Sequence, residues 1–300
     1  MFERILVSVD EDHAHLEMVD KAARMLGEAG LLELFCCVHQ ALLGSGGLRS
    51  AEAERRARHA YMTQCEARLD HLADRIRLPH ERVGTDVSWN AHLVKGVLTK
   101  VERFRPDLLV YPVSSHPGFL HHLLAPEDWK LLREATLPLL MTREHHWGSR
   151  LRLAVALDPF HPLDEPASLD GKLYGIAHHL ARHLDAELHV LHSYQALPQS
   201  TIFDEHRVTD FAGLQEEVRH KHQQKLEAML APWRNEPGAA QLHLIEGELH
   251  HVVPDFVEQT GIDLLIVGNV PRGALDRLLS GSSAERLLDR VRCDLMVIKP

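Results

Sequence analysis

The chain has 300 residues and a mass of 34.0 kDa, which is enough for two ordinary domains and excludes a mini-protein fold. With 45% hydrophobic and 25% charged residues, its composition is that of a globular protein rather than a disordered or fibrous one. The formal net charge of −10 creates no field that would attract polyanions, so we expect no nucleic-acid partner.

Predicted strands and helices alternate along the chain, an order that favours parallel sheets covered by helices on both faces. In the first half we predict strands over residues 4–9, 32–38, 83–88, 107–112 and 138–142, with helices over 13–29, 51–76, 91–104 and 127–135. In the second half we predict strands over 152–157, 186–192, 240–245, 263–267 and 295–298, with helices over 166–184, 212–231, 249–259 and 282–291. Each half is therefore expected to be a five-stranded, doubly wound α/β domain.

The two halves also repeat one another in sequence. The segment RPDLLVYPV, residues 105–113, matches GIDLLIVGN, residues 261–269, and ILVSVD ending at Asp10 matches LAVALD ending at Asp158. A repeat of this length indicates a duplicated domain rather than a short-period solenoid. We place the domains at residues 1–147 and 148–300.

No segment predicts export or a membrane span. The N-terminus enters an apolar strand directly, and no apolar run approaches the roughly 18 residues that a spanning helix needs. The four cysteines, Cys36, Cys37, Cys65 and Cys293, show no CxxC spacing and no disulfide framework. We therefore expect a cytoplasmic protein.

Doubly wound sheets bind ligands beyond the carboxyl ends of their strands, where the strand order reverses. In the second half, Gly268 ends the fourth strand, and Gly281, Ser282 and Ser283 open the next predicted helix. Free N–H groups and the positive end of a helix favour an anion there, and the two hydroxyls add donors. The alternative is that the serines only cap the helix and Gly268 only serves a turn.

These residues carry a family resemblance. The spacing from Gly268 to Gly281 and Ser282, together with Asp158 and the ending VRCDLMVIKP, resembles the universal stress protein family over the whole chain, as two tandem domains. The resemblance implies a Rossmann-like fold of the adenine nucleotide alpha-hydrolase type in each domain. It also implies ATP or another adenine nucleotide in the second domain, with Asp158 on the base or ribose. An aspartate before proline is otherwise an ordinary turn former.

One position departs from the family pattern. Pro271 stands where the family has its second marked glycine, and proline offers no N–H to a phosphate. Arg272 and Arg277 are candidates to compensate by charge, although exposed arginines are also commonly just solvated. His192, at the end of the second strand of this half, is a candidate contact for the adenine.

The first half lacks the phosphate residues. Pro112, Ala125 and Pro126 stand where the second half has Gly268, Gly281 and Ser282, so we expect a degenerate site. The loop that replaces it is apolar and contains histidines, which leaves a packing role, a domain contact or an apolar ligand open.

The chain has 24 histidines, an unusually high number. His179 and His183 are four residues apart on a predicted helix and share a face, a spacing that zinc ligands use. Without a third ligand in sequence, the alternative is a pair of solvated side chains.

We expect a stress-response protein that binds a small regulatory molecule rather than a dedicated catalyst. The alternatives are a slow ATPase, which needs a placed base and a carboxylate-held magnesium ion, or a metal- or lipid-binding stress protein that has lost the nucleotide. The resemblance also implies that the two domains pair within the chain through their last strands. It leaves a homodimer of two chains open.

Overall fold

The computed structural model describes residues 1–10, 15–44, 50–113, 126–160, 164–195, 211–234, 236–268, 287 and 290–299. The chain divides into two compact units, Met1–Trp147 and Gly148–Pro300. Each unit contains a five-stranded sheet in which every strand is parallel to its neighbours. The predicted α/β fold with two parallel, five-stranded sheets is therefore confirmed.

The first unit has the strand order β3-β2-β1-β4-β5. Its strands are β1 (Phe2–Val9), β2 (Leu26–Val38), β3 (Val83–Trp89), β4 (Leu108–Pro112) and β5 (Leu139–Thr142). Its helices are α1 (Leu16–Met25), α2 (Ala41–Gly44), α3 (Ala51–Ala73), α4 (Leu93–Phe104) and α5 (Pro126–Glu134), with a 3-10 turn η1 (His80–Arg82).

The second unit repeats this plan with the order β10-β9-β6-β7-β8. Its strands are β6 (Arg152–Ala156), β7 (Glu187–Tyr194), β8 (Gln241–Glu246), β9 (Leu264–Gly268) and β10 (Asp294–Ile298). Its helices are α6 (Asp164–His183), α7 (Phe211–Leu230) and α8 (Leu249–Thr260), with a 3-10 turn η3 (Ala231–Trp233). Most of the helix predicted over 282–291 lies outside the described residues.

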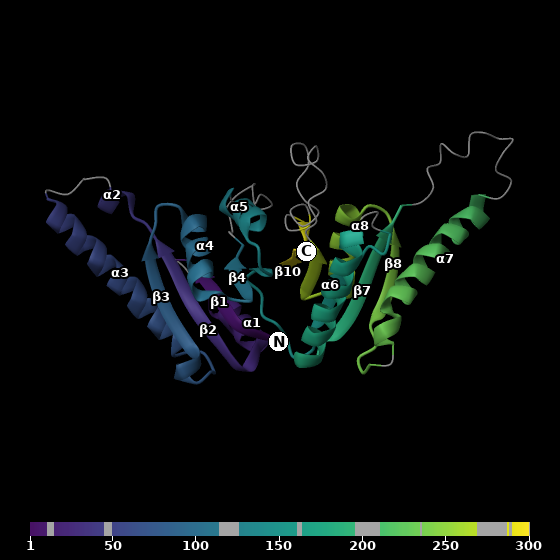
Figure 1. Ribbon diagram of the computed structural model, residues 1–300, viewed down its shortest axis with the longest axis horizontal. Helices are drawn as coiled ribbons and strands as arrows, with labels where there is room; N and C mark the ends of the chain where they lie inside the picture. Colours follow the sequence, from purple (N-terminus) through teal and green to yellow (C-terminus); the bar gives the residue numbers. More distant parts are fainter. Residues whose placement is uncertain are drawn as a thin grey trace. The chain divides into compact units, whose positions relative to one another are not determined.

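Helices cover the sheets because parallel strands need crossover connections, which are right-handed almost without exception. That rule places the helices after the first two strands of a unit on one face and the later ones on the other. In Figure 1, α3 lies along β3 and β2, and α7 lies along β7 and β8. The strands consequently bury both faces: Ile5, Leu6 and Val7 of β1 are fully buried, as are Leu264 and Leu265 of β9.

The predicted end of the first helix and the predicted start of the second strand, at residue 32, are both wrong. The helix predicted over 13–29 ends at Met25, and β2 begins at once at Leu26, which pairs with Phe2. Glycine costs about 1 kcal/mol relative to alanine inside a helix, so Gly27 and Gly30 weaken a helical continuation. The Arg82 guanidinium also donates to the carbonyl oxygens of Gly27 and Gly30, at 2.6 and 2.8 Å. This distant arginine holds the segment in its extended form.

The first unit buries a lysine between two acidic side chains. Lys100 of α4 donates to the Glu33 carboxylate of β2 and, at 2.7 Å, to the Asp86 carboxylate of β3. The Phe35 and Phe104 rings lie 5.8 and 5.7 Å from its ammonium nitrogen. The lysine thus separates two carboxylates on neighbouring strands.

Replacing Lys100 with methionine should lower the free energy of unfolding of the first unit by about 2–3 kcal/mol, because two partly buried carboxylates then face each other unpaired. Hydrogen exchange of β2 and β3 peptides measures the loss. Lys95→Met, on the exposed side of the same helix, is the matched control and should change stability by less than about 0.5 kcal/mol. Equal protection in the two variants would contradict a stabilising role for the lysine.

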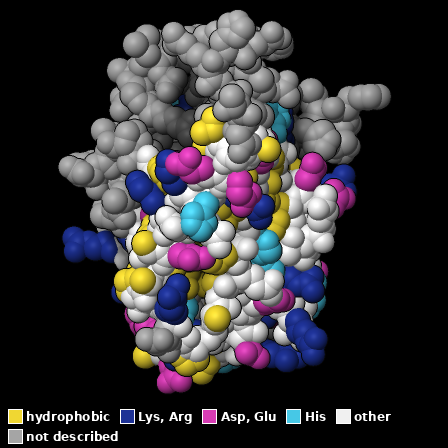
Figure 2. Space-filling model, turned by 90° about the vertical axis from the view of Figure 1, so that its right-hand side faces the viewer, with side chains coloured by type: hydrophobic (Ala, Val, Ile, Leu, Met, Phe, Trp, Pro, Cys, Tyr) yellow, Lys and Arg dark blue, Asp and Glu magenta, His cyan; other side chains and the backbone are white. Residues whose placement is uncertain are grey.

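The surface carries mixed charge. On the side of the molecule that Figure 2 turns to the viewer, basic, acidic and histidine side chains are interspersed. On α7, Lys221 pairs with Glu217 at 2.7 Å and Arg219 with Glu216 at 3.9 Å, one helical turn apart. Within the described part of the chain, no helix is long and apolar enough to cross a membrane.

Candidate functional site

The strand order of the second unit reverses between β6 and β9, since β7 follows on one side of β6 and β9 lies on the other. Asp158 lies two residues after the end of β6 and is exposed, and Gly268 is the last residue of β9. The structure therefore brings these two predicted site residues to the edge where doubly wound sheets bind ligands.

Two hydrogen bonds hold the turn after β6. The Asp158 carboxylate accepts from the Phe160 N–H at 3.2 Å, and the Asp158 N–H donates to the Asp170 carboxylate of α6 at 3.3 Å. Asp170 is 7% exposed, and burial raises the pKa of its carboxyl from 3.8 to about 6. Asp170 was not predicted as a site residue from the sequence. The available signal was an acidic residue one turn before Tyr174, on the buried side of a helix.

His192 of β7 is 1% exposed, and both of its ring nitrogens are engaged. Nδ1 lies 2.9 Å from the carbonyl oxygen of Leu157, which can only accept, so Nδ1 carries the proton. Nε2 therefore accepts from Nδ1 of His222, 2.7 Å away on α7. Burial lowers the pKa of His192, and burial together with the neighbouring His192 lowers that of His222. The pair is thus a fixed chain of neutral imidazoles, and the contact of His192 with an adenine stays a prediction.

An aromatic cluster covers this histidine pair. Phe160 stacks on His192 with ring centroids 6.2 Å apart, and lies 4.0 Å from the ring of His222. The ammonium of Lys225 lies 4.3 Å from the centre of the Phe160 ring, and Tyr194 lies 5.1 Å from His222. Phe160, His222 and Lys225 were not predicted as site residues, because they come from a turn and from α7, and only the fold brings them together.

Gly268 has a packing role that the sequence did not reveal. A Cβ atom at this position would lie 3.0 Å from a methyl group of Leu169 and 3.1 Å from one of Leu173, both on α6. The missing side chain therefore lets α6 approach β9 closely, whether or not a ligand lies beyond the strand.

The predicted phosphate residues Arg272, Arg277, Gly281, Ser282 and Ser283 lie outside the described residues. They come after Gly268 in the chain, between residues 272 and 283.

The first unit differs at the equivalent edge. Asp10, the partner of Asp158 in the repeat, lies 2.7 Å from Nε2 of His15, which starts α1 in a left-handed backbone conformation. The strand equivalent to β9 is β4, and it ends at Pro112 instead of glycine. Ala125 lies outside the described residues.

The histidines predicted to hold zinc lie on α6. His179 and His183 are both exposed. Their neighbour His178 is buried, faces Glu236 at 3.5 Å and stacks on Tyr174. Among the described residues, three potential metal ligands converge at the start of α8, and this group does not include His179 or His183. Zinc at His179 and His183 therefore stays a prediction.

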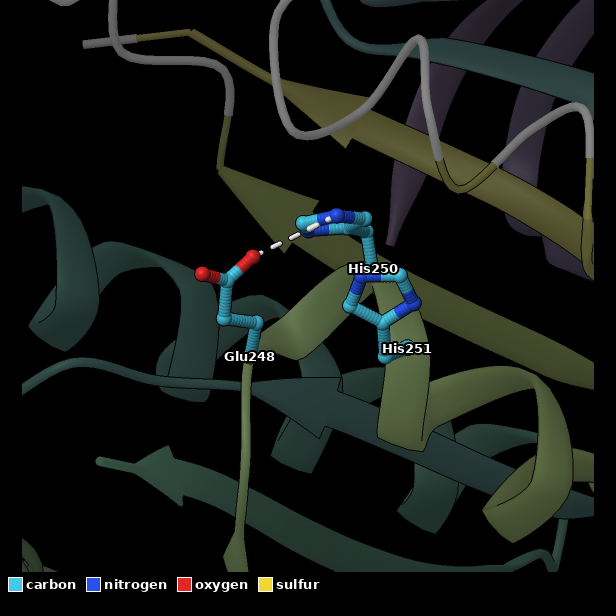
Figure 3. Close-up of side chains that lie close together, drawn as sticks. All are labelled: Glu248, His250 and His251. Carbon is cyan, nitrogen blue, oxygen red and sulfur yellow. Dashed lines mark ion pairs between the residues drawn. The ribbon is translucent and has the colours of Figure 1, made fainter. Parts of the chain in front are cut away.

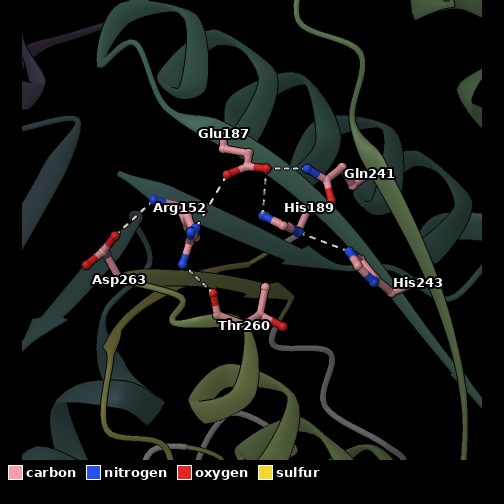
Figure 4. Close-up of polar contacts among 7 residues, drawn as sticks. All are labelled: Arg152, Glu187, His189, Gln241, His243, Thr260 and Asp263. Atoms are coloured by element: carbon pink, nitrogen blue, oxygen red, sulfur yellow. Dashed lines mark hydrogen bonds and ion pairs between the residues drawn. The ribbon is translucent and has the colours of Figure 1, made fainter. Parts of the chain in front are cut away.

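A polar cluster lies at the opposite edge of the sheet, where β6, β7 and β8 begin (Figure 4). Arg152 reaches Glu187 at 3.4 Å and the carbonyl oxygen of Thr260 at 2.8 Å, while its N–H donates to Asp263 at 2.9 Å. His189 and His243 lie with ring nitrogens 2.9 Å apart, and burial lowers both pKa values. Ligands of such sheets bind at the carboxyl edge, so we interpret this cluster as structural.

Comparison with known proteins agrees with the repeat. A model of the universal stress protein family matches residues 1–143 and 161–299. Universal stress protein E homolog of Haemophilus influenzae is 22% identical over 309 residues, covering 100% of this chain and 98% of that protein. Universal stress protein E of Escherichia coli strain K12 is 24% identical over 311 residues, covering 100% and 95%.

Solved structures show the same fold. A functionally unknown protein of Pseudomonas aeruginosa PAO1 superposes with a TM-score of 0.68 at 20% identity, covering 100% of this chain and 93% of that one. A universal stress protein of Archaeoglobus fulgidus has a TM-score of 0.63 at 13% identity, covering 98% and 96%. At these identities the likeness concerns the fold alone.

Proposed function

Because the chain belongs to the universal stress protein family, we propose that it is a cytoplasmic stress-response protein that binds an adenine nucleotide at the carboxyl edge of its second unit as a regulatory ligand. The observation that carries the proposal is the placement of Asp158 and Gly268 at the point where the strand order reverses.

Each residue has a distinct role in this proposal. Asp158 is exposed and contacts the base or ribose, while Gly281 lets the backbone approach the phosphates. Ser282 and Ser283 donate hydroxyl hydrogen bonds, and Arg272 and Arg277 supply the charge that offsets the N–H group missing at Pro271.

His192 is buried beneath this site and holds its residues in place. Its two nitrogens already bond to Leu157 and His222, so it fixes the chain just before Asp158. Phe160 packs against the rings of both His192 and His222. We therefore place the adenine against the side chains of Phe160 and His222, which cover His192.

The asymmetry between the units favours one ligand per chain. In the first unit the Asp10 carboxylate is already bound to His15, and Pro112 and Pro126 replace residues of the phosphate segment. We expect calorimetry to give a stoichiometry of one nucleotide per chain.

Gly281→Trp should abolish ATP binding, because an indole would fill the space in which the phosphates approach the backbone. The measurement is calorimetric titration of the purified chain with ATP, preceded by mass spectrometry of the small molecules that denaturation releases. Wild type should bind and the variant should give no binding heat.

The matched control is Gly148→Trp. Gly148 is exposed, and a Cβ atom there would have no neighbour within 4 Å, so this variant should bind ATP as the wild type does. If wild type neither releases nor binds an adenine nucleotide, the proposal fails and Pro271 marks a lost site. Equal binding by wild type and Gly281→Trp would place the nucleotide elsewhere.

A further inference from the structure

A carboxylate and two imidazoles meet at the start of α8. Glu248 is the residue before the helix, and His250 and His251 belong to its first turn. The Glu248 carboxylate lies 3.4 Å from Nε2 of His250, and one potential ligand atom from each of the three side chains lies within 4.8 Å of the others. Figure 3 shows His250 pointing toward Glu248, with the ring of His251 beside it. Glu248 and His251 are exposed and His250 is partly buried, so the group is open to solvent.

The donor set and the spacing suit a divalent transition-metal ion. Imidazole nitrogen and carboxylate oxygen are ligands of zinc, nickel, cobalt and copper. Bonds of about 2.0–2.1 Å in tetrahedral geometry place neighbouring ligand atoms roughly 3.3–3.4 Å apart. Glu248 and His250 already have this separation. The third ligand atom reaches it by rotation of an exposed side chain.

Arg290 opposes a metal ion at this position. Its Nη1 lies 3.1 Å from Nδ1 of His251 and 3.2 Å from the carbonyl oxygen of His250. The guanidinium therefore occupies the lone pair of Nδ1, which leaves the ring proton on Nε2, and brings a positive charge next to the cluster. Ligation through Nδ1 needs this lone pair, and ligation through Nε2 moves the proton to Nδ1, so either way a metal ion displaces Arg290, and the arginine lowers the affinity of the site.

We propose that Glu248, His250 and His251 form a metal site for a divalent transition ion such as zinc, with water in the remaining position and Arg290 as its competitor. The site is separate from the residues proposed for the nucleotide. It also differs from the pair His179 and His183, which offers only two ligands on one helix.

Titration of the metal-free, full-length protein with zinc alone tests the proposal, with cobalt absorption spectra as a second readout of ligation. The double variant Glu248→Gln, His251→Asn should bind zinc at least about tenfold more weakly than wild type, since even outer-shell partners contribute about 10–100-fold to metal affinity. The control is His179→Asn, His183→Asn, which removes two exposed histidines from α6 and should keep the wild-type affinity. The control is needed because the chain has 24 histidines, and imidazole is a general ligand for transition-metal ions.

Arg290→Gln provides a test that misfolding cannot imitate, because the expected result is a gain. Removing the competing cation should tighten zinc binding several-fold and leave the stoichiometry unchanged. The proposal is overturned if the Glu248 and His251 variant binds zinc as wild type does, if the α6 control loses as much affinity, or if Arg290→Gln weakens binding.

Discussion

Replacing His192 with alanine should lower the free energy of unfolding of the second unit by about 2–4 kcal/mol. The side chain is 1% exposed, so its removal leaves a cavity between β7 and α7. It also removes the donor to the Leu157 carbonyl oxygen and the ring on which Phe160 stacks. Because the chain has two units, hydrogen exchange of peptides from β6 and β7 is the suitable measurement rather than a single melting curve.

Two variants make this prediction specific. His192→Asn places an amide N–H near the position of Nδ1, so it should recover about 1 kcal/mol through the bond to Leu157. His179→Ala, on the exposed side of α6, should change stability by less than about 0.5 kcal/mol. A loss no larger for His192→Ala than for His179→Ala would show that the buried imidazole does not hold the site together.

Replacing Asp170 with asparagine should stabilise the second unit most above pH 7, about half as much at pH 5 and hardly at all below about pH 4. Burial raises the pKa of this carboxyl from 3.8 to about 6, so the folded chain binds an extra proton between these values. The folded state therefore loses stability as the pH rises from about 4 through 6, because ionised Asp170 is then buried. The asparagine oxygen still accepts from the Asp158 N–H but never ionises.

We expect the gain at pH 8 to be about 1–2 kcal/mol, less than the roughly 3 kcal/mol that the shift from 3.8 to about 6 represents, because the protein around a buried charge relaxes and reduces its cost. Urea denaturation followed by hydrogen exchange at pH 5 and pH 8 measures the difference. Asp255→Asn, exposed on α8, is the control that should show no such dependence on pH. A stability difference between Asp170→Asn and wild type that is the same at both pH values would exclude this titration.

The alternation of apolar runs and helical periods was sufficient to predict the five strands of each unit, because a strand buried on both faces has a distinctive composition. The end of α1 was not predictable in this way. Its limit depends on Arg82, more than 50 residues away in sequence, and on the pairing of Leu26 with Phe2. Neither contact can be deduced from the helix propensities of the residues near Met25.

The candidate site was predictable only where it follows a strand. Asp158 and Gly268 are recognisable because the ends of parallel strands share an edge of the sheet. Phe160, Asp170 and His222 come from a turn and two helices, and their contacts arise from tertiary packing. Gly268 is recognisable from the sequence, but the sequence does not reveal all of its roles. This glycine lies at the edge where ligands bind, and it also makes room for Leu169 and Leu173.

The buried polar groups of the two units differ in kind. The first unit buries a lysine between carboxylates, whereas the second buries the pairs His192 with His222 and His189 with His243. Burial lowers the pKa of all four histidines, so protonation below about pH 6.5 favours the unfolded state of that unit. A chain that arose by doubling one domain thus carries two copies of the same architecture with different buried polar groups. Within the second unit, a fall in pH destabilises the histidine pairs but relieves the buried charge of Asp170, so the two effects oppose each other.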